Sequence, residues 1–253
     1  MPSTLPIASL RGNSERRAHP PGRGLRTAPL AGRAASLRLA ATLATLLLLP
    51  AHSSTAAGSG GIRLEIKDPK GAPVADAVAS LVPLDASPTL APPAEPVMVV
   101  QEREEFVPYV TAIVAGTRVN FPNRDKVQHH VFSFSKAKRF DLPLYRGEPS
   151  APVLFDEPGI VSLGCNIHDW MSAYIVVLAT PHFQKSAGDG VALLRDLPAG
   201  RYRLEVWHPR IKAIFQRELA VAPNDTAMQT ISVVLGVDRR IRRAPEGGAG
   251  GYK

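Results

Sequence analysis

The chain has 253 residues and a formal net charge of +8. Seven arginines and one glutamate in the first 57 residues account for +6 of that charge, so the rest of the chain is near +2 (8 − 6). The length allows one or two domains. After residue 57 the sequence has no stripe of lysine and arginine interleaved with aromatic residues, and the composition therefore argues against a nucleic-acid partner.

Residues 1–57 have the pattern of a cleaved export signal. Arginines extend to Arg38, an almost wholly apolar run covers 39–49, and Thr55-Ala56-Ala57 offers an A-x-A-like cleavage site. The apolar run is shorter than the ~20 residues that cross a bilayer, so we predict no integral membrane span in the mature chain. The stretch before the apolar run is long for a signal peptide, which a mis-assigned start codon would explain. The predicted location is the periplasm or another exported compartment.

The remaining chain predicts an all-β fold. Residues 83–96 contain five prolines and are expected to form a linker, while 136–158 are expected to be an excursion with two short apolar pieces. No segment has a convincing helical period. Alternating or continuous apolar runs predict strands at 62–67, 77–82, 97–101, 106–114, 118–121, 131–135, 160–163, 173–179, 191–194, 202–207, 214–221 and 230–235.

Cys165 is the only cysteine of the chain, and His168 and Met171 follow it at three-residue steps. In an oxidising compartment a lone thiol is an inert buried side chain, a link to another chain or a metal ligand. A thiolate, an imidazole and a thioether suit copper, with the thioether as a weak axial donor. Such a site needs a second imidazole, for which His129 and His130 are the upstream candidates. The pattern predicts one mononuclear copper site.

These residues resemble the cupredoxins, the small blue copper proteins, over roughly residues 95–181. The resemblance rests on two motifs, Asn123-x-Asp125-x-x-x-His129 and Cys165-x-x-His168-x-x-Met171, whose loop spacing is most similar to amicyanin. It implies a Greek-key β-sandwich. It also implies that His129, Cys165 and His168 form the trigonal ligand set and that Met171 is the axial contact.

The same resemblance implies a hydrogen-bonding role for Asn123, which in the family ties the first-ligand loop to the cysteine loop. Strand alternation alone does not choose between His129 and His130, whereas the family spacing selects His129. The chain departs from the family at Asp169 and Trp170, which replace a small or apolar pair. A carboxylate at Asp169 would disfavour an acidic partner near the metal and stabilise its oxidised form. Trp170 is alternatively a packing residue.

A second resemblance concerns the flanking segments. Residues 66–77 and 188–207 look like parts of a carboxypeptidase-regulatory-like, transthyretin-like β-sandwich. We expect this sandwich to comprise residues 61–92 plus 184–237 and the copper module to be inserted into it; two β domains in tandem are the alternative. Residues 238–253 are expected to form a disordered tail. As a whole, the mature chain is similar to exported bacterial proteins labelled as methylamine-utilisation or plastocyanin-like.

The expected function is outer-sphere electron transfer by a type 1-like copper that cycles between Cu(I) and Cu(II), with an unidentified redox protein as partner. The alternatives are a periplasmic copper carrier or sensor, or a surface interaction module with incidental copper. An enzyme is not expected, because the sequence lacks a visible acid-base or nucleophile constellation. His182 and His208 are interpreted as a surface loop residue and a packed corner, with a second copper site as the alternative.

Overall fold

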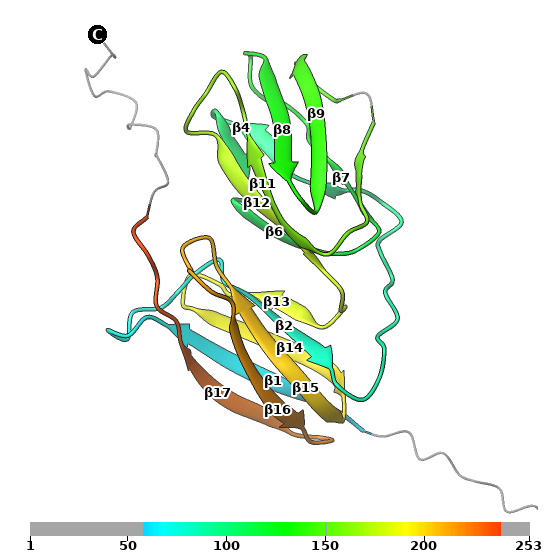
Figure 1. Ribbon diagram of the computed structural model, residues 1–253, viewed down its shortest axis with the longest axis vertical. Coiled ribbons are helices and arrows are strands. Elements are labelled where there is room, and N and C mark those ends of the chain that lie inside the picture. The colour runs from blue at the N-terminus through cyan, green and yellow to red at the C-terminus, as the bar shows by residue number, and fades with distance from the viewer. Residues whose placement is uncertain (1–57, 150, 239–253) are drawn as a thin grey trace, which may run out of the picture. The chain divides into compact units, whose positions relative to one another are not determined.

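The computed structural model describes residues 58–149 and 151–238 (Figure 1). Within these residues every regular element is a β-strand, which confirms the all-β fold class. The described part of the chain accordingly contains no helix that could cross a membrane. The predicted export signal (1–57) and the predicted tail after residue 238 lie outside the described residues.

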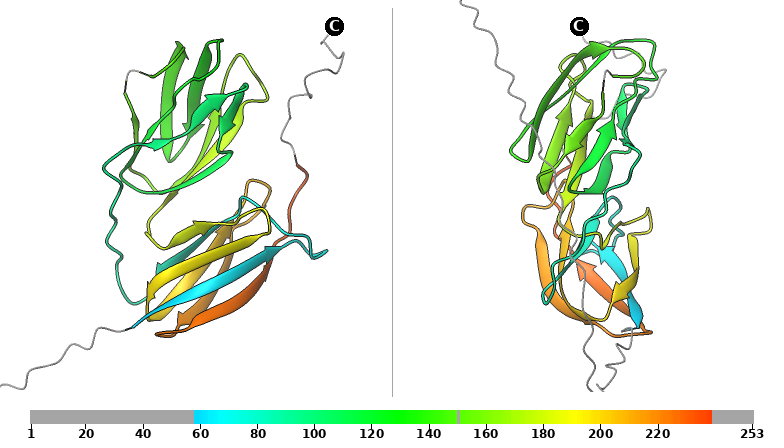
Figure 2. Two further views of the ribbon diagram at one scale, coloured as in Figure 1. Left: turned by 180° about the vertical axis from the view of Figure 1, so that it is seen from behind. Right: turned by 90° about the vertical axis from the view of Figure 1, so that its right-hand side faces the viewer.

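Two sheets are formed by strands from the beginning and the end of the described chain. One has the order β14 (Val191–Pro198), β1 (Ser59–Lys67) and β17 (Thr226–Ser232), and these strands run side by side in Figure 2. The other has the order β13 (Phe183–Lys185), β2 (Val78–Pro83), β15 (Gly200–Trp207) and β16 (Phe215–Val221). Both sheets contribute to one apolar core, which includes Ile62, Leu64, Ile66, Leu81, Leu194, Leu204 and Ile231.

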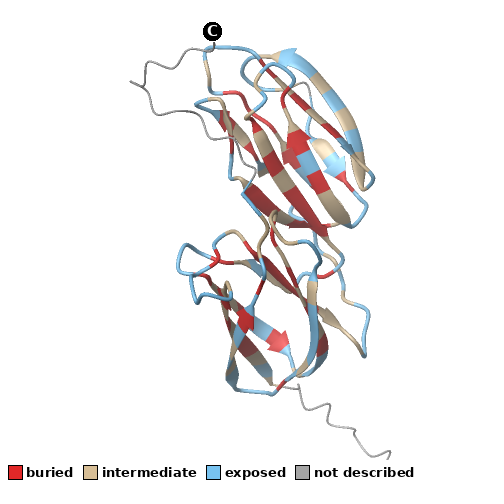
Figure 3. Cartoon of the chain, turned by 60° about the vertical axis from the view of Figure 1, so that its left-hand side comes forward, coloured by how far each residue is buried: buried red, intermediate tan, exposed pale blue. Residues whose placement is uncertain are grey.

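Alternation along β1 explains how this core is filled. Ile62, Leu64 and Ile66 are at most 1% exposed. The charged residues between them face outward, where Lys67 Nζ donates to Glu65 Oε2 at 2.9 Å. A period of two places one set of side chains on each face of a strand, so the apolar set packs inward. Figure 3 shows how buried residues alternate with less buried ones along strands of the chain.

Strands from the middle of the chain form a five-stranded sheet with the order β6 (Val110–Val114), β12 (Ser172–Leu178), β11 (Gly159–Gly164), β8 (His129–Ser135) and β9 (Lys138–Tyr145). A three-stranded sheet has the order β10 (Val153–Phe155), β7 (Thr117–Asn120) and β3 (Val97–Met98). A two-stranded hairpin joins β4 (Val100–Glu102) to β5 (Glu105–Val107). Their shared core includes Val119, Phe121, Phe155, Val161, Leu163, Cys165, Met171 and Ile175.

The strands differ from the sequence-based prediction in several places. The run 97–101 is divided into β3 and β4, and the run 106–114 into β5 and β6 around Pro108, since proline cannot donate a ladder hydrogen bond. β9 and β10 occupy parts of the expected excursion, and the alternation of β9 was obscured because it is an edge strand with six of its eight residues charged, prolyl or aromatic. The short strand β13 was not predicted, and the last strand, β17, begins four residues earlier than expected.

Candidate metal centre

The first ligand candidate, His129, opens β8. This strand alternates between two faces: His129, Val131 and Ser133 are buried, whereas His130 and Phe132 lie on the opposite face. His129 is 0% exposed. The inward set of β8 therefore delivers one imidazole into the core that also contains Cys165 and Met171.

His130 has a different environment. Its Nε2 lies 2.5 Å from Asp141 Oδ1 on the neighbouring strand β9. Its ring packs against that of Phe132, and the two ring centroids are 5.3 Å apart. The two adjacent histidines thus face opposite sides of the sheet, as the period of two requires. Only His129 belongs to the histidine–cysteine group described below.

The cysteine loop connects β11 to β12. β11 ends at Gly164, Cys165 follows at once, and β12 begins at Ser172, directly after Met171. A turn closes the loop, because the backbone N–H of Met171 donates to the carbonyl of His168 at 2.9 Å. Cys165 and Met171 are 5% and 1% exposed, respectively, and His168 is half-buried. The loop thereby buries both sulfurs and leaves the imidazole between them near the surface.

Three donor atoms converge where β8 meets this loop. His129 Nδ1 lies 3.1 Å from His168 Nδ1, and Cys165 Sγ lies 3.8 Å from the same His168 nitrogen. The ligand atoms of His129, Cys165 and His168 all lie within 4.8 Å of one another. Two imidazoles and a thiol at these separations are a donor set that binds a soft or borderline transition metal without a large rearrangement.

Asp125 orients His129 from behind. Its Oδ2 lies 2.8 Å from His129 Nε2, and the carboxylate is an acceptor, so Nε2 carries the proton and the lone pair of Nδ1 faces the site. The β4–β5 turn holds this carboxylate, because the backbone N–H groups of Arg103 and Glu104 donate to it at 2.7 and 2.8 Å. Both turn residues have positive φ, at 56° and 57°, which directs their amides to one side.

These contacts keep the carboxyl ionised. Burial raises the pKa of Asp125, but the hydrogen bonds from Glu104, His129 and Arg103 together outweigh burial and hold that pKa below its usual range. The sequence analysis did not identify the contact between Asp125 and residues 103–104. No local pattern marks it, since it joins residues more than twenty positions apart.

The Asn123 side chain braces the loop that leads to His129. Its Nδ2 donates to the carbonyls of Val127 and Tyr145 at 2.9 and 2.8 Å, and its Oδ1 accepts from the Asp125 N–H at 2.9 Å. The resemblance implied a tie to the cysteine loop. Among the described residues these bonds instead join the 123–128 loop to itself and to the end of β9, so Asn123 acts on the orientation of Asp125 and His129.

Trp170 packs beside the half-buried histidine. Its ring centroid lies 5.2 Å from that of His168 at an interplanar angle of 53°, and it contacts the core around Cys165. Its Nε1–H is buried and has no hydrogen-bond partner among the described residues. This placement agrees with a packing role, in which the indole limits the ring orientations open to His168. Asp169 is exposed.

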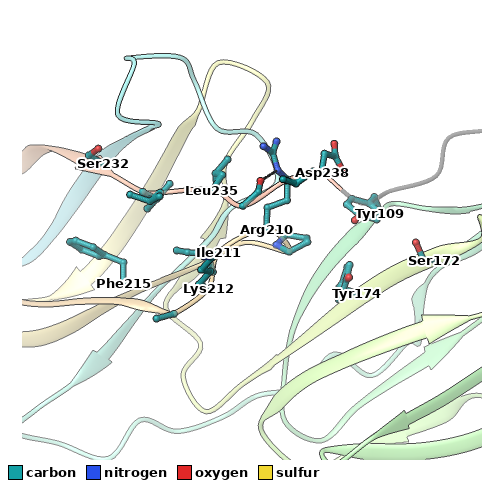
Figure 4. A pocket seen from close by; sticks show the side chains of 16 residues that line it. Tyr109, Ser172, Tyr174, Arg210, Ile211, Lys212, Phe215, Ser232, Leu235 and Asp238 are labelled. Carbon is teal, nitrogen blue, oxygen red and sulfur yellow. Dashed lines mark hydrogen bonds between the residues drawn. The ribbon is translucent and has the colours of Figure 1, made fainter.

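Two further described histidines, His182 and His208, do not belong to the group. The His182 ring meets that of Tyr202 edge-on at 6.0 Å, and His208 Nδ1 accepts from the Arg210 N–H at 3.1 Å. Both belong to the packing of the strands that surround them. A separate hollow is lined by Tyr109, Tyr174 and residues of 209–215 and 232–238 (Figure 4). Its lining includes none of the four sequence-predicted ligands.

Comparison with solved structures gives partial matches to copper proteins. The Cu-containing nitrite reductase NirK from Thermus scotoductus SA-01 is 25% identical with a TM-score of 0.32, and the match covers 38% of this chain and 25% of that chain. A purple cupredoxin from Nitrosopumilus maritimus is 21% identical with a TM-score of 0.29, covering 32% of this chain and 99% of that chain. A mutant of amicyanin in the reduced state is 18% identical with a TM-score of 0.31, covering 40% and 98%. The sequence matches no protein-family model, and a search among curated proteins gave no match.

Proposed function

We propose that this protein is an exported copper protein that transfers electrons between redox partners. The single observation that carries the proposal is the convergence of His129, Cys165 and His168 on one buried point. In this proposal these three residues hold the ion, and Met171 supplies a weak axial thioether. An electron carrier needs no substrate pocket, so the proposal includes no enzymatic activity.

The chemistry of the donors supports copper. Mg²⁺ and Ca²⁺ prefer oxygen ligands, whereas a thiolate with two imidazoles suits copper or zinc. A methionine adjoining the set favours copper, since zinc sites rarely use a thioether. Bound copper would supply a one-electron couple. The chain would hold the ligands in nearly the same geometry in both states, because His129 is fixed by Asp125 and both sulfurs are buried.

The strand pairing supports a split scaffold around the copper module. Strands on both sides of residues 97–178 pair with one another: β2 pairs with β13 and β15, and β1 pairs with β14 and β17. We propose on this ground that residues 95–181 are inserted into a sandwich formed by 61–92 and 184–237.

Copper loading of the purified protein tests the proposal. We expect one equivalent of Cu²⁺ to give an intense visible absorption from the cysteine-to-copper charge transfer, and a paramagnetic spectrum with a small copper hyperfine splitting. Cys165→Ser removes the sulfur with little change in volume and should abolish the absorption. A wild-type protein that takes up Cu²⁺ but stays colourless would contradict the type 1 assignment, and one that takes up no copper would contradict the metal site.

The exposure of the cysteine loop favours a second candidate, a copper carrier or sensor. Asn166 and Ile167 are exposed and His168 is half-buried, so an incoming ligand from a partner can reach the site. A carrier should lose Cu(I) within seconds to a competing chelator, whereas an electron-transfer protein should keep the ion and exchange electrons rapidly. Stopped-flow mixing with a chromogenic Cu(I) chelator separates the two.

A further inference from the structure

The outward face of β8 carries a ladder of three aromatic rings. His130, Phe132 and Phe134 occupy alternate positions, with centroid distances of 5.3 Å from His130 to Phe132 and 5.1 Å from Phe132 to Phe134. Phe134 is 74% exposed, more than any other described aromatic side chain. An exposed aromatic side chain forgoes the free energy that its burial would supply. Here it also extends a ladder of rings, which makes this face a candidate for contact with a partner.

The middle ring of the ladder, Phe132, lies against the residue that precedes the cysteine. Phe132 pairs with Gly164 of β11, and a Cβ built on Gly164 would lie 2.9 Å from Phe132 Cζ. The Cζ end of the ring therefore lies over Gly164, and a larger residue at position 164 would displace it. Cys165 is the next residue in the chain. The middle ring of the ladder thus lies one residue from Cys165, and the Phe134 end is open to solvent.

Positive charge surrounds the open end. Arg139 is the cross-strand partner of Phe134, and Lys136 is two residues further along the chain; both are exposed. Neither has an ion pair within the described residues. The nearby Lys138 is paired with Asp156 at 3.2 Å. Asp141, opposite Phe132, contributes one carboxylate, which lies 2.5 Å from His130 Nε2. Lys136 and Arg139 outnumber this carboxylate, so the face carries a net positive charge.

We propose that the face formed by Phe132, Phe134, Lys136 and Arg139 docks a redox protein whose contact surface has an apolar centre bordered by carboxylates. The electron-transfer part of this inference rests on the proposed function. One electron would pass between the partner's cofactor and the copper site by way of Phe132, the Gly164 backbone and Cys165, and no bond would form or break. Charge also argues against the chain's own end as the occupant, because residues 239–243 contain four arginines.

The docking face lies on β8 and β9, whereas the exposed residues of the cysteine loop lie between β11 and β12. Phe134 lies at the far end of the ladder from His130, whereas Ile167 and His168 belong to the loop itself. The protein would then have two places for electron entry and exit. Charged borders accelerate encounter and lose strength with salt, and the buried apolar centre determines the lifetime of the complex.

An acidic flavodoxin is a suitable probe, since its oxidised form is diamagnetic and its hydroquinone is a one-electron donor. We would titrate the ¹⁵N-labelled copper-free protein with oxidised flavodoxin and map the amide shifts. The expected result is a cluster of shifts over residues 132–141, weakened by salt. Phe134→Ser and Arg139→Glu should each weaken binding about tenfold or more. Ile167→Ser, an exposed apolar change on the cysteine loop, is the matched control and should leave the affinity unchanged.

Kinetics on the copper-loaded protein supply the second arm. The rate of reduction by flavodoxin hydroquinone should fall about tenfold in Phe134→Ser and Arg139→Glu, while the visible spectrum and the reduction potential stay as in wild type. Shifts confined to residues 126–128 and 166–168, or affinities insensitive to Phe134→Ser, would overturn the docking face. Self-association that Phe134→Ser abolishes would overturn it too, because the occupant would be a second copy.

The two arms separate this inference from the proposed function. The shift mapping needs no copper, so it reports docking even if the metal assignment fails. Copper loading with normal colour but no docking at residues 132–141 would instead leave the proposed function intact and remove the docking face.

Discussion

Asp125 Oδ2 and His129 Nε2 lie 2.8 Å apart, and two backbone amides of the β4–β5 turn hold the carboxylate in place. The adjacent histidine has a superficially similar partner, since His130 Nε2 lies 2.5 Å from Asp141 Oδ1. The side chains of His129 and Asp125 are 0% and 14% exposed, respectively, whereas the Asp141 side chain is 66% exposed. An aspartate–histidine pair thus occurs once inside the candidate site and once outside it. The pair Asp141–His130 can therefore serve as the control for the pair Asp125–His129.

Replacing Asp125 by Asn should weaken copper binding. The amide keeps the shape of the side chain but removes the negative charge that orients and enriches the His129 imidazole. We expect a loss of about 10- to 100-fold in Cu²⁺ affinity and a higher reduction potential, since the charge stabilises the more positive ion. Competition titrations and potentiometry measure both. Asp141→Asn should change neither, and equal effects of the two variants would show that Asp125 has no specific role.

Replacing Met171 by Leu should separate ligation from packing. Met171 is 1% exposed, and a near-isosteric apolar change in a core costs less than about 1.5 kcal/mol of unfolding free energy. If the thioether is the axial ligand, the variant should still bind copper, with a raised reduction potential and an altered visible spectrum. Met228→Leu on β17 is a control at 65% exposure. An unchanged potential and spectrum in Met171→Leu would assign that side chain to packing alone.

Both the backbone conformation and the surrounding atoms require a glycine at position 190. It has φ of +76°, and an added Cβ would lie 2.5 Å from the Ile66 carbonyl oxygen. Gly71 has φ of +87° with open space around it, so Gly71→Ala isolates the conformational cost. We expect Gly71→Ala to lower the unfolding free energy by about 1 kcal/mol and Gly190→Ala by at least about 2–3 kcal/mol. Urea denaturation measures both; equal losses would mean that the strand end relaxes around the methyl group.

The protein should lose stability as the pH falls below about 6.5. Burial, with a smaller contribution from Arg210, lowers the pKa of His208, and burial lowers the pKa of His182. A histidine with a lowered folded-state pKa resists protonation, whereas the unfolded chain takes up the proton near its ordinary pKa. The unfolded state therefore binds more protons, and stability rises with pH through this window.

Urea denaturation of the copper-free protein between pH 5 and 8 tests this dependence. The unfolding free energy should decline from pH 7 to pH 5, and His208→Gln should flatten the decline. The double variant with His182→Gln should be flatter still. A wild-type profile that is level across the window, or one that rises toward acid pH, would contradict the assigned direction of both pKa shifts.

Local pattern was enough to predict most strands, because alternation records which face of a strand is buried. Ile62, Leu64 and Ile66 are one instance, and the inward set of β8 is another. The same rule failed for β9, where residues such as Arg139 and Asp141 lie on the exposed face of an edge strand. An edge strand buries little apolar surface, so its sequence is only weakly constrained by the core.

The candidate site was predictable to the extent that its residues lie on single loops. Cys165, His168 and Met171 are close in sequence, and the structure brings His129 to the first two of them. The contact between Asp125 and the β4–β5 turn could not be predicted, since it depends on how two separate loops meet. Asn123 was predicted to make hydrogen bonds, but their partners depend on the position of β9, whose strand had not been recognised.

Both neighbours of β1 come from far along the chain. Ile62 is paired with Leu194 on one side and with Ala227 on the other. The first described strand therefore has no partner strand in its sheet until β14 has been synthesised, and such non-local pairing makes folding slow. In the export that we propose, this sheet could close only after residues 226–232 had crossed the membrane.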